Sequence, residues 1–256
     1  MITIFSTLKP FEGHISIIQR NAIMSWKNLK GKPEIILLGN EPGVAEICKE
    51  LDLIHIPDIA YNEYKKPLCE DVFQRAQKIA KYDIVAYVNA DIILMDNFID
   101  AAKLCGYDHF LMVGQRFDLN IAKPIDFRGA WTSVLKYKVR KNGVLHKSTG
   151  IDYFVFRKND WLDIPPMVIG VIAWDNWLVS TAINKGHIVI DATEFISVIH
   201  QNHVSARIKD YKLLLEQDPQ SAKNRELADT KGGRVHSGFT NHAPWVMTVT
   251  GEIKCR

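Results

Sequence analysis

Strand-sized apolar runs alternate with amphipathic segments through the first 105 residues, and this alternation constrains the fold more than any other feature. Apolar runs predict strands over 2–7, 34–38, 53–56 and 83–94. Helical spacing of apolar residues predicts helices over 14–29, 43–51, 70–81 and 98–104, the last capped by Asp96 or Asn97. Strands that alternate with helices build a mainly parallel sheet covered on both faces. The predicted fold class is therefore α/β.

The pattern changes after about residue 106. Apolar runs predict strands over 109–117, 152–156, 187–190 and 194–200. Helices are expected over 174–184 and, as one polar helix, over 211–227, and Gly232 and Gly233 begin a tail expected to be irregular. We expect a single domain over 1–256, made of a first half (1–105), a mixed second portion (106–205) and a C-terminal helix and tail (206–256).

Composition excludes several classes of protein. The chain holds 32 Lys and Arg against 29 Asp and Glu, and this net charge of +3 is too small to predict a nucleic-acid partner. Its apolar runs fall short of the roughly 20 residues of a membrane helix, and we expect no signal peptide. Peripheral membrane contact stays open because aromatic residues such as Trp245 lie near the tail. The four scattered cysteines predict free thiols in a cytoplasmic protein rather than disulfides or a zinc site.

Polar residues follow the predicted strands where ligands of parallel sheets bind, at the carboxyl ends. These ends are Ser6-Thr7, Gly39-Asn40-Glu41, Pro57-Asp58 and Asn89-Ala90-Asp91. We interpret Asn89 and Asp91 as two residues apart on one strand, which places both on the same face. An amide and a carboxylate there suit Mg²⁺ or Mn²⁺, which in turn binds phosphate. The alternative is that they only end the strand with a turn.

Three further positions carry possible chemistry. His200 and His203 close a predicted strand and can complete a metal site with Asp91, or they are simply polar residues that leave a strand. Asp175 lies at the start of a predicted helix, beside aromatic residues. It is either a general base or simply an acidic residue that the helix dipole favours at that end. Asp152 lies two residues after Gly150, and it either binds hydroxyl groups or opens a strand.

Several well-known motifs are missing. There is no G-x-G-x-x-G after the first predicted strand and no G-x-x-x-x-G-K-[ST]. There is also no G-x-S-x-G. The sequence therefore does not support a nicotinamide-dependent dehydrogenase, a P-loop NTPase or an α/β-hydrolase.

The order of these features resembles a GT-A-fold glycosyltransferase. An α/β half leads to the D-x-D-like Asn89-Ala90-Asp91, then to a helix with Asp175, then to a strand that ends in His200. Segments 149–156, 172–178 and 191–203 also look like a group of bacterial and plant proteins with GT-A-like domains. The resemblance covers about residues 1–205. It implies a Rossmann-like sheet, a nucleotide-binding half over 1–105 and an acceptor and metal half over 106–205.

In GT-A enzymes the acidic motif binds Mn²⁺ or Mg²⁺, which holds the diphosphate of a nucleotide sugar. Asp91 matches the last position of that motif, and Asn89 departs from its first. His200 or His203 matches a histidine ligand that is often found late in this fold.

The resemblance also assigns the remaining roles. Asp175 matches the base of inverting members, and Asp152 is expected to bind donor or acceptor hydroxyls. The donor nucleotide is expected near Ser6, Thr7, Asn40, Glu41, Arg75, Asn89 and Ala90.

The function that the resemblance implies is a metal-dependent glycosyltransferase. It would move a sugar from a nucleotide-diphosphate sugar, with a UDP-sugar as the expected donor, to a hydroxyl of a glycan or another acceptor. A nucleotidyltransferase of sugar phosphates is an alternative, but that class usually has a Gly-rich basic stretch after its first strand, and residues 6–13 hold one Gly and one Lys. A non-catalytic nucleotide- or glycan-binding module is the other alternative, favoured by the departure at Asn89.

Overall fold

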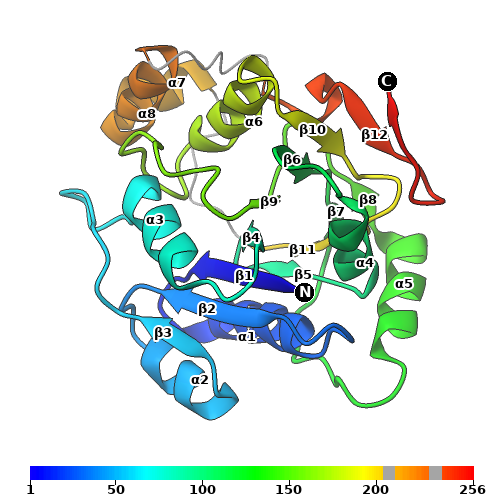
Figure 1. The fold of residues 1–256 in the computed structure, drawn as a ribbon. Helices are drawn as coiled ribbons and strands as arrows, with labels where there is room; N and C mark the ends of the chain where they lie inside the picture. The colour runs from blue at the N-terminus through cyan, green and yellow to red at the C-terminus, as the bar shows by residue number, and fades with distance from the viewer. Residues whose placement is uncertain (204–210, 231–237) are drawn as a thin grey trace.

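The computed structural model describes residues 1–203, 211–230 and 238–256 (Figure 1). In the first half, β1 (Ile2–Thr7), β2 (Glu34–Leu38), β3 (Ile54–Ile56) and β4 (Ile84–Val88) alternate with α1 (Gly13–Lys27), α2 (Val44–Leu51) and α3 (Cys69–Ile79). These strands pair in parallel in the order β4-β1-β2-β3. Their carboxyl ends therefore meet at one edge of the sheet, as the alternation predicted.

The second half extends the same sheet. It adds β6 (Phe110–Val113), β9 (Tyr153–Arg157), β10 (Ile188–Asp191), β12 (Trp245–Met247) and β13 (Ile253–Cys255). The order is β13-β12-β10-β6-β9-β4-β1-β2-β3. Of the described strands in this sheet, only β9 and β13 run antiparallel to their neighbours. The prediction of an α/β fold with a mainly parallel sheet is confirmed.

Helices cover both faces of this sheet. Further helices are α4 (Asn97–Leu104), α6 (Trp174–Asn184), α7 (Tyr211–Gln217), α8 (Pro219–Thr230) and a short 3₁₀ helix (Thr240–His242). One core cluster packs α1, α2 and α4 against one face, and a second packs α3, α6 and α8 against the other. Ile4 and Phe5, neighbours on β1, belong to opposite clusters. Burial on both faces explains why the strands read as continuous apolar runs.

A smaller sheet lies beside the main one. It has the order β5-β11-β7-β8 and is formed by β5 (Ile92–Ile93), β11 (Ile199–Gln201), β7 (Phe117–Leu119) and β8 (Val144–Leu145). Helix α5 (Trp131–Asn142) packs against it through a third core cluster that includes Trp131 and Leu135. This sheet brings residues near 91, 118 and 200 together, although they are far apart in the sequence.

Two predicted strands are each divided in the structure. The run 83–94 forms β4 and β5, which belong to different sheets because the chain turns at Asn89–Asp91. The run 109–117 likewise divides into β6 and the start of β7. Gly114 lies in the break, where a Cβ atom would stand 2.2 Å from the hydroxyl oxygen of Tyr153.

The C-terminal third differs most from the predictions. The helix expected over 211–227 is two helices, because Pro219 starts α8 and the Asp218 carboxylate accepts hydrogen bonds from Gln220 N and Ser221 Oγ. Gly232 and Gly233 lie outside the described residues. The tail was expected to be irregular, but its last part forms β12 and β13 at the edge of the main sheet. Helix α5 was not predicted.

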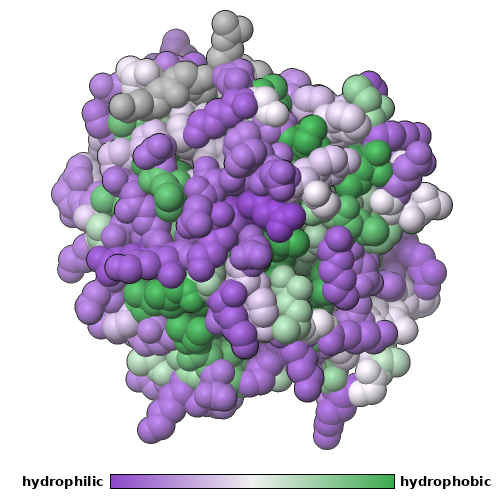
Figure 2. All heavy atoms as spheres, in the orientation of Figure 1, coloured by the Kyte–Doolittle hydropathy of each residue, from purple (hydrophilic) through white to green (hydrophobic). Residues whose placement is uncertain are grey.

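Other local predictions have clear outcomes. Asp96 is the N-cap residue of α4, but its carboxylate makes no capping hydrogen bond and accepts one from Lys30 N instead. The strand predicted over 194–200 begins only at Ile199. The four cysteines are free, as predicted, and Cys255 is the exposed one. No helix in the described part of the chain has the length and apolar content needed to cross a membrane. Hydrophilic side chains cover most of the face seen in Figure 2.

An aromatic cluster centred on Phe73 of α3 fixes one helical layer to the sheet. Phe73 is fully buried, and its ring lies 5.1 Å from Phe5, 5.5 Å from Tyr87 and 5.8 Å from Phe156 between centroids. We expect Phe73→Ala to lower the free energy of unfolding by about 3–5 kcal/mol, because it leaves a cavity in this cluster. Urea denaturation measures the change. Ile79→Ala, at a 44% exposed position of the same helix, is the control, and an equal loss there would contradict this assignment.

Candidate active site

The turn after β4 carries the first part of the site. β4 ends at Val88, and Ile92 N donates a hydrogen bond to Asn89 O over 3.1 Å, so Asn89–Asp91 link the two sheets as a turn. The expectation that Asn89 and Asp91 share a strand face is therefore wrong. Their side chains have different partners, since Asn89 Nδ2 donates to Asp152 Oδ1 (2.8 Å) and Asp91 lies against histidines.

Asp91, His200 and His203 form a cluster that fits a divalent cation. Asp91 Oδ2 lies 3.5 Å from His200 Nε2 and 3.2 Å from His203 Nε2, and one ligand atom from each residue lies within 4.8 Å of the others. Ligands about 2.1 Å from an octahedral ion stand about 3 Å apart, close to these distances. Asp91 is more than a hundred positions from the two histidines in the sequence, and antiparallel pairing of β5 with β11 brings them together.

The chemistry of this cluster also fits a cation. The second oxygen of Asp91, Oδ1, is buried and accepts no hydrogen bond within the described residues. Burial alone would raise the pKa of Asp91, but hydrogen bonds and charge from His200 and His203 hold it well below its usual range. Burial lowers the pKa of His200, and the Asp91 carboxylate outweighs this and raises it. A bound cation can take the place of the proton that this arrangement favours.

A second carboxylate, Asp118 on β7, is hydrogen-bonded to His146 and lies beside the ring of His200. His146 Nδ1 lies 2.7 Å from Asp118 Oδ2, and His200 Nδ1 lies 3.1 Å from Asp118 Oδ1. Burial raises the pKa of Asp118, but the hydrogen bond from His146 and the charge of Arg116 lower it overall. A carboxylate behind a histidine fixes which ring nitrogen faces a metal.

Arg116 joins this cluster to Asp152. Arg116 Nη1 lies 2.5 Å from Asp152 Oδ2, and its Nε lies 3.1 Å from Asp118 Oδ1. Asp152 is buried, and Asn89 occupies its other oxygen. With neutral imidazoles, the three carboxylates and one guanidinium of this network leave two uncompensated negative charges. One divalent cation would balance them.

Two cavities open on either side of Asn89. The first, here named the β1/β4 cleft, has a volume of about 670 Å³ and is lined by residues that include Thr7, Glu41, Ala90, Asp91 and His203. The second, here named the α6 pocket, has a volume of about 520 Å³ and is lined by residues that include Arg116, His146, Asp152 and Asp175. Asn89, Gly170 and Val171 line both, so the two cavities adjoin.

Three lysines line the β1/β4 cleft with the acidic cluster. They are Lys9 after β1 and Lys65 and Lys66 in the loop between β3 and α3. None of their ammonium groups forms an ion pair within the part of the chain that is described. A cleft with lysines and a cation site suits an anionic ligand that carries phosphate groups.

Asp175 lies in the first turn of α6 and lines the α6 pocket. Its Oδ1 accepts a hydrogen bond from Asn176 N over 2.9 Å. Trp174, next to it, is buried with its ring edge-on to Tyr87, 5.3 Å between centroids. Ala173 precedes the helix with a φ of 84°, a left-handed conformation that costs a non-glycine residue about 1–3 kcal/mol and is typical of functional sites.

The other predicted donor residues have varied surroundings. Thr7, Glu41 and Ala90 line the β1/β4 cleft, whereas Ser6 is buried and donates its hydroxyl to Val88 O. Asn40 and Arg75 do not line either cavity. Asn40 N donates to the hydroxyl oxygen of Tyr61, and Arg75 pairs with Asp71, 2.7 Å away on the same helix.

Sequence reasoning missed Arg116, Asp118 and His146. A signal was present, since Arg116 and Asp118 alternate with the apolar Phe117 and follow the apolar strand β6. That pattern marks the end of a strand, which is where the other candidates were found. The role of His146 had no local signal, because it depends on pairing between β7 and β8.

Comparison with known proteins gives a match in structure only. No protein-family model matches the chain, and no curated protein matches it. Glucosyl-3-phosphoglycerate synthase from Mycobacterium tuberculosis, solved with Mn²⁺, UDP and phosphoglyceric acid, is similar at 14% identity over 89% of this chain and 78% of its own, with a TM-score of 0.52. The mannosyltransferase PcManGT from Pyrobaculum calidifontis, solved with GDP-Man and Mn²⁺, is similar at 12% identity over 90% of this chain, with a TM-score of 0.50.

The chain has a GT-A-like fold. The resemblance expected from the sequence is thereby confirmed at the level of architecture, and these identities carry the likeness no further than the fold. The chain spans 63% of the mannosyltransferase. It spans 36% of S. aureus TarS 1-349, which aligns with 47% of this chain at 12% identity and a TM-score of 0.37.

The contacts of Asp118 generate a prediction. We expect Asp118→Asn to weaken Mn²⁺ binding about 10- to 100-fold, because the amide removes the negative charge that lies 3.1 Å behind the His200 ring and makes that imidazole a stronger ligand. Isothermal titration calorimetry with Mn²⁺ alone measures this. Asp126→Asn serves as control, since Asp126 pairs with Arg128 away from the cluster. Unchanged Mn²⁺ affinity in Asp118→Asn would contradict this role.

Proposed function

We propose that this protein is a metal-dependent glycosyltransferase that transfers a sugar from a nucleotide-diphosphate sugar to a hydroxyl acceptor. The observation that supports this most strongly is the Asp91, His200 and His203 cluster, which lies at the carboxyl ends of β4 and β11 within a GT-A-like fold. Two neighbours with that fold were solved with Mn²⁺ and a nucleotide or nucleotide sugar. The β1/β4 cleft beside the cluster is a suitable size for such a donor.

We assign donor binding to the β1/β4 cleft. Thr7, Glu41 and the Asn89–Ala90 turn face the nucleotide, and Lys9, Lys65 and Lys66 offer positive charge to its phosphates. Asp91, His200 and His203 would hold Mn²⁺ or Mg²⁺, which supplies positive charge to stabilise the diphosphate as it leaves. A UDP-sugar remains the expected donor.

We assign the acceptor to the α6 pocket and the base to Asp175. The carboxylate of Asp175 takes the proton of the acceptor hydroxyl as its oxygen attacks the anomeric carbon of the donor sugar. Asp152 shares this pocket, but Arg116 and Asn89 occupy both of its oxygens, so its role is to bind and orient hydroxyl groups rather than to accept a proton.

Nucleotide binding tests the proposal most directly. A thermal-shift series with UDP, GDP, dTDP, CMP and ADP, each with Mn²⁺ or with EDTA, should give stabilisation by one nucleotide that EDTA removes. A ligand at a hundred times its dissociation constant stabilises by about 2.7 kcal/mol, which is readily measured. If no nucleotide shifts the melting transition, the result contradicts the proposal and favours a non-catalytic module as the function of this protein.

Removal of the carboxylate ligand tests how much the cation site contributes to nucleotide binding in the cleft. We expect Asp91→Ala to abolish Mn²⁺-dependent nucleotide binding, because two imidazoles alone hold the cation weakly. Asp83→Ala, at the opposite end of β4, is the matched control and should behave as the wild type. Undiminished Mn²⁺-dependent binding by Asp91→Ala would remove that residue from the cation site.

The proposed base is tested by an isosteric change. Asp175→Asn should leave donor binding intact and lower kcat by about a hundred- to ten-thousandfold, since an amide cannot accept the proton. The assay follows release of nucleoside diphosphate, which a nucleotidyltransferase would replace by pyrophosphate. Normal transfer by Asp175→Asn would exclude it as the base and favour a retaining mechanism.

A further inference from the structure

Residues 127–151 concentrate positive charge on one part of the molecule. The segment has no Asp or Glu and holds six basic residues, which are Arg128, Lys136, Lys138, Arg140, Lys141 and Lys147. Because the whole chain has a net charge of only +3, the rest of the chain is net acidic. The segment forms α5 and β8, and α5 lies at the edge of the molecule beside the small sheet to which β8 belongs (Figure 1).

The cations of α5 face solvent. Lys136, Lys138, Arg140 and Lys141 are all exposed, and none forms an ion pair with another described residue. Arg128 differs, since it pairs with Asp126 over 2.7 Å. Four uncompensated charges on two turns of one helix repel each other and raise the free energy of the fold. A partner with negative charge would relieve that repulsion.

Apolar side chains are exposed among these cations. Val134 and Tyr137 on α5 are 52% and 57% exposed, and Val144 and Leu145 on β8 are 65% and 45% exposed. They account for four of the large hydrophobic residues that the described chain leaves exposed. β8 is also the edge strand of its sheet, paired only with β7. The surface that consists of α5 and β8, here named the α5/β8 surface, is thus both basic and apolar.

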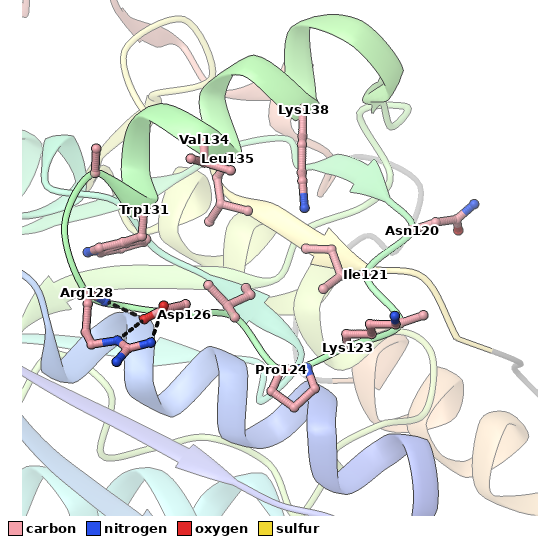
Figure 3. A pocket seen from close by; sticks show the side chains of 13 residues that line it. Asn120, Ile121, Lys123, Pro124, Asp126, Arg128, Trp131, Val134, Leu135 and Lys138 are labelled. Carbon is pink, nitrogen blue, oxygen red and sulfur yellow. Dashed lines mark hydrogen bonds and ion pairs between the residues drawn. The ribbon is translucent and has the colours of Figure 1, made fainter.

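A groove runs beside this surface (Figure 3). It has a volume of about 560 Å³, and its apolar lining includes Ile121 and Pro124 from the preceding loop and Trp131 and Leu135 from α5. Lys138 extends from α5 over the groove in Figure 3. Val134 and Lys138 belong both to the groove and to the exposed face of the helix, so the two are continuous.

We propose that the α5/β8 surface docks on an anionic phospholipid bilayer. The lysines and arginines of α5 complement the phosphate groups, and Val134 and Tyr137 enter the boundary between headgroups and acyl chains. The free edge of β8 meets the same boundary, with Val144 on one side of the strand and Leu145 on the other. A nucleic acid would bind the cations, but its phosphates would not account for the exposed Val144 and Leu145 on β8. A second copy of the chain, docked face to face, would bring like charges together.

The proposal does not depend on the transferase activity, but it has a consequence for how an acceptor reaches the α6 pocket. His146 directly follows Leu145 and lines the α6 pocket. A bilayer in contact with Leu145 would therefore be one residue along the chain from a residue that lines the pocket we assign to the acceptor. Membrane docking would bring a lipid-linked hydroxyl to that pocket.

Vesicle cosedimentation of the full chain tests the docking surface. The wild type should bind vesicles of phosphatidylcholine mixed with phosphatidylglycerol and should bind pure phosphatidylcholine at least about tenfold more weakly. Each basic residue near an anionic surface contributes roughly fivefold to partitioning. Neutralising Lys136, Lys138, Arg140 and Lys141 to Gln together should therefore reduce binding by at least about tenfold, and Tyr137→Ser with Val144→Ser should reduce it severalfold.

The matched control neutralises exposed lysines elsewhere. Lys49→Gln, Lys78→Gln, Lys103→Gln and Lys223→Gln lie on α2, α3, α4 and α8 and should leave vesicle binding unchanged. Circular dichroism melting confirms that each variant is folded. The proposal is overturned if the wild type does not bind anionic vesicles, if the control loses as much binding as the α5 variant, or if RNA binds in place of vesicles and only the cations matter.

Discussion

Three carboxylates, one buried and two partly buried, meet where the two sheets join, and the need to pair them governs the site. Asp91 leaves β4, Asp118 lies on β7 and Asp152 precedes β9. A buried charge without a partner costs several kcal/mol, so each carboxylate must be matched. Arg116 pairs with Asp118 and Asp152, His146 also pairs with Asp118, and the imidazoles of His200 and His203 pair with Asp91. These contacts also fix the small sheet against the large one, because they cross between them.

The same charges divide the site into two parts. Asp91 faces the β1/β4 cleft with His203, and Asp152 faces the α6 pocket with Arg116. Asn89 lies between these two parts and lines both cavities, and its side-chain amide donates a hydrogen bond to Asp152. This accounts for an asparagine rather than an acid at this position. A fourth carboxylate beside Asp152 would repel it, whereas an amide donates a hydrogen bond.

The predictability of the fold differs between the two halves for a physical reason. In residues 1–105 each helix packs onto the strands next to it in sequence, so local periodicity decides the outcome. After residue 106, β9 inserts between β4 and β6, and the small sheet pairs β5 with β11 across more than a hundred residues. Such pairings leave no local periodicity, and short strands such as β8 (Val144–Leu145) are invisible in a window of ordinary length. Helix α5 was missed since its exposed face mixes valine and tyrosine with lysine.

The sequence by itself determined the α/β class, the carboxyl-end location of Asp91, and the candidacy of His200, His203 and Asp175, because strand ends and helix starts are local features. Tertiary structure alone decided that Asp91 and the two histidines share one site, that Arg116, Asp118 and His146 support it, and that Arg75 is engaged by Asp71 on its own helix. The reason is that hydrogen-bond partners of buried charges come from whichever strands the sheet places side by side. That arrangement is a property of the whole fold, not of any segment.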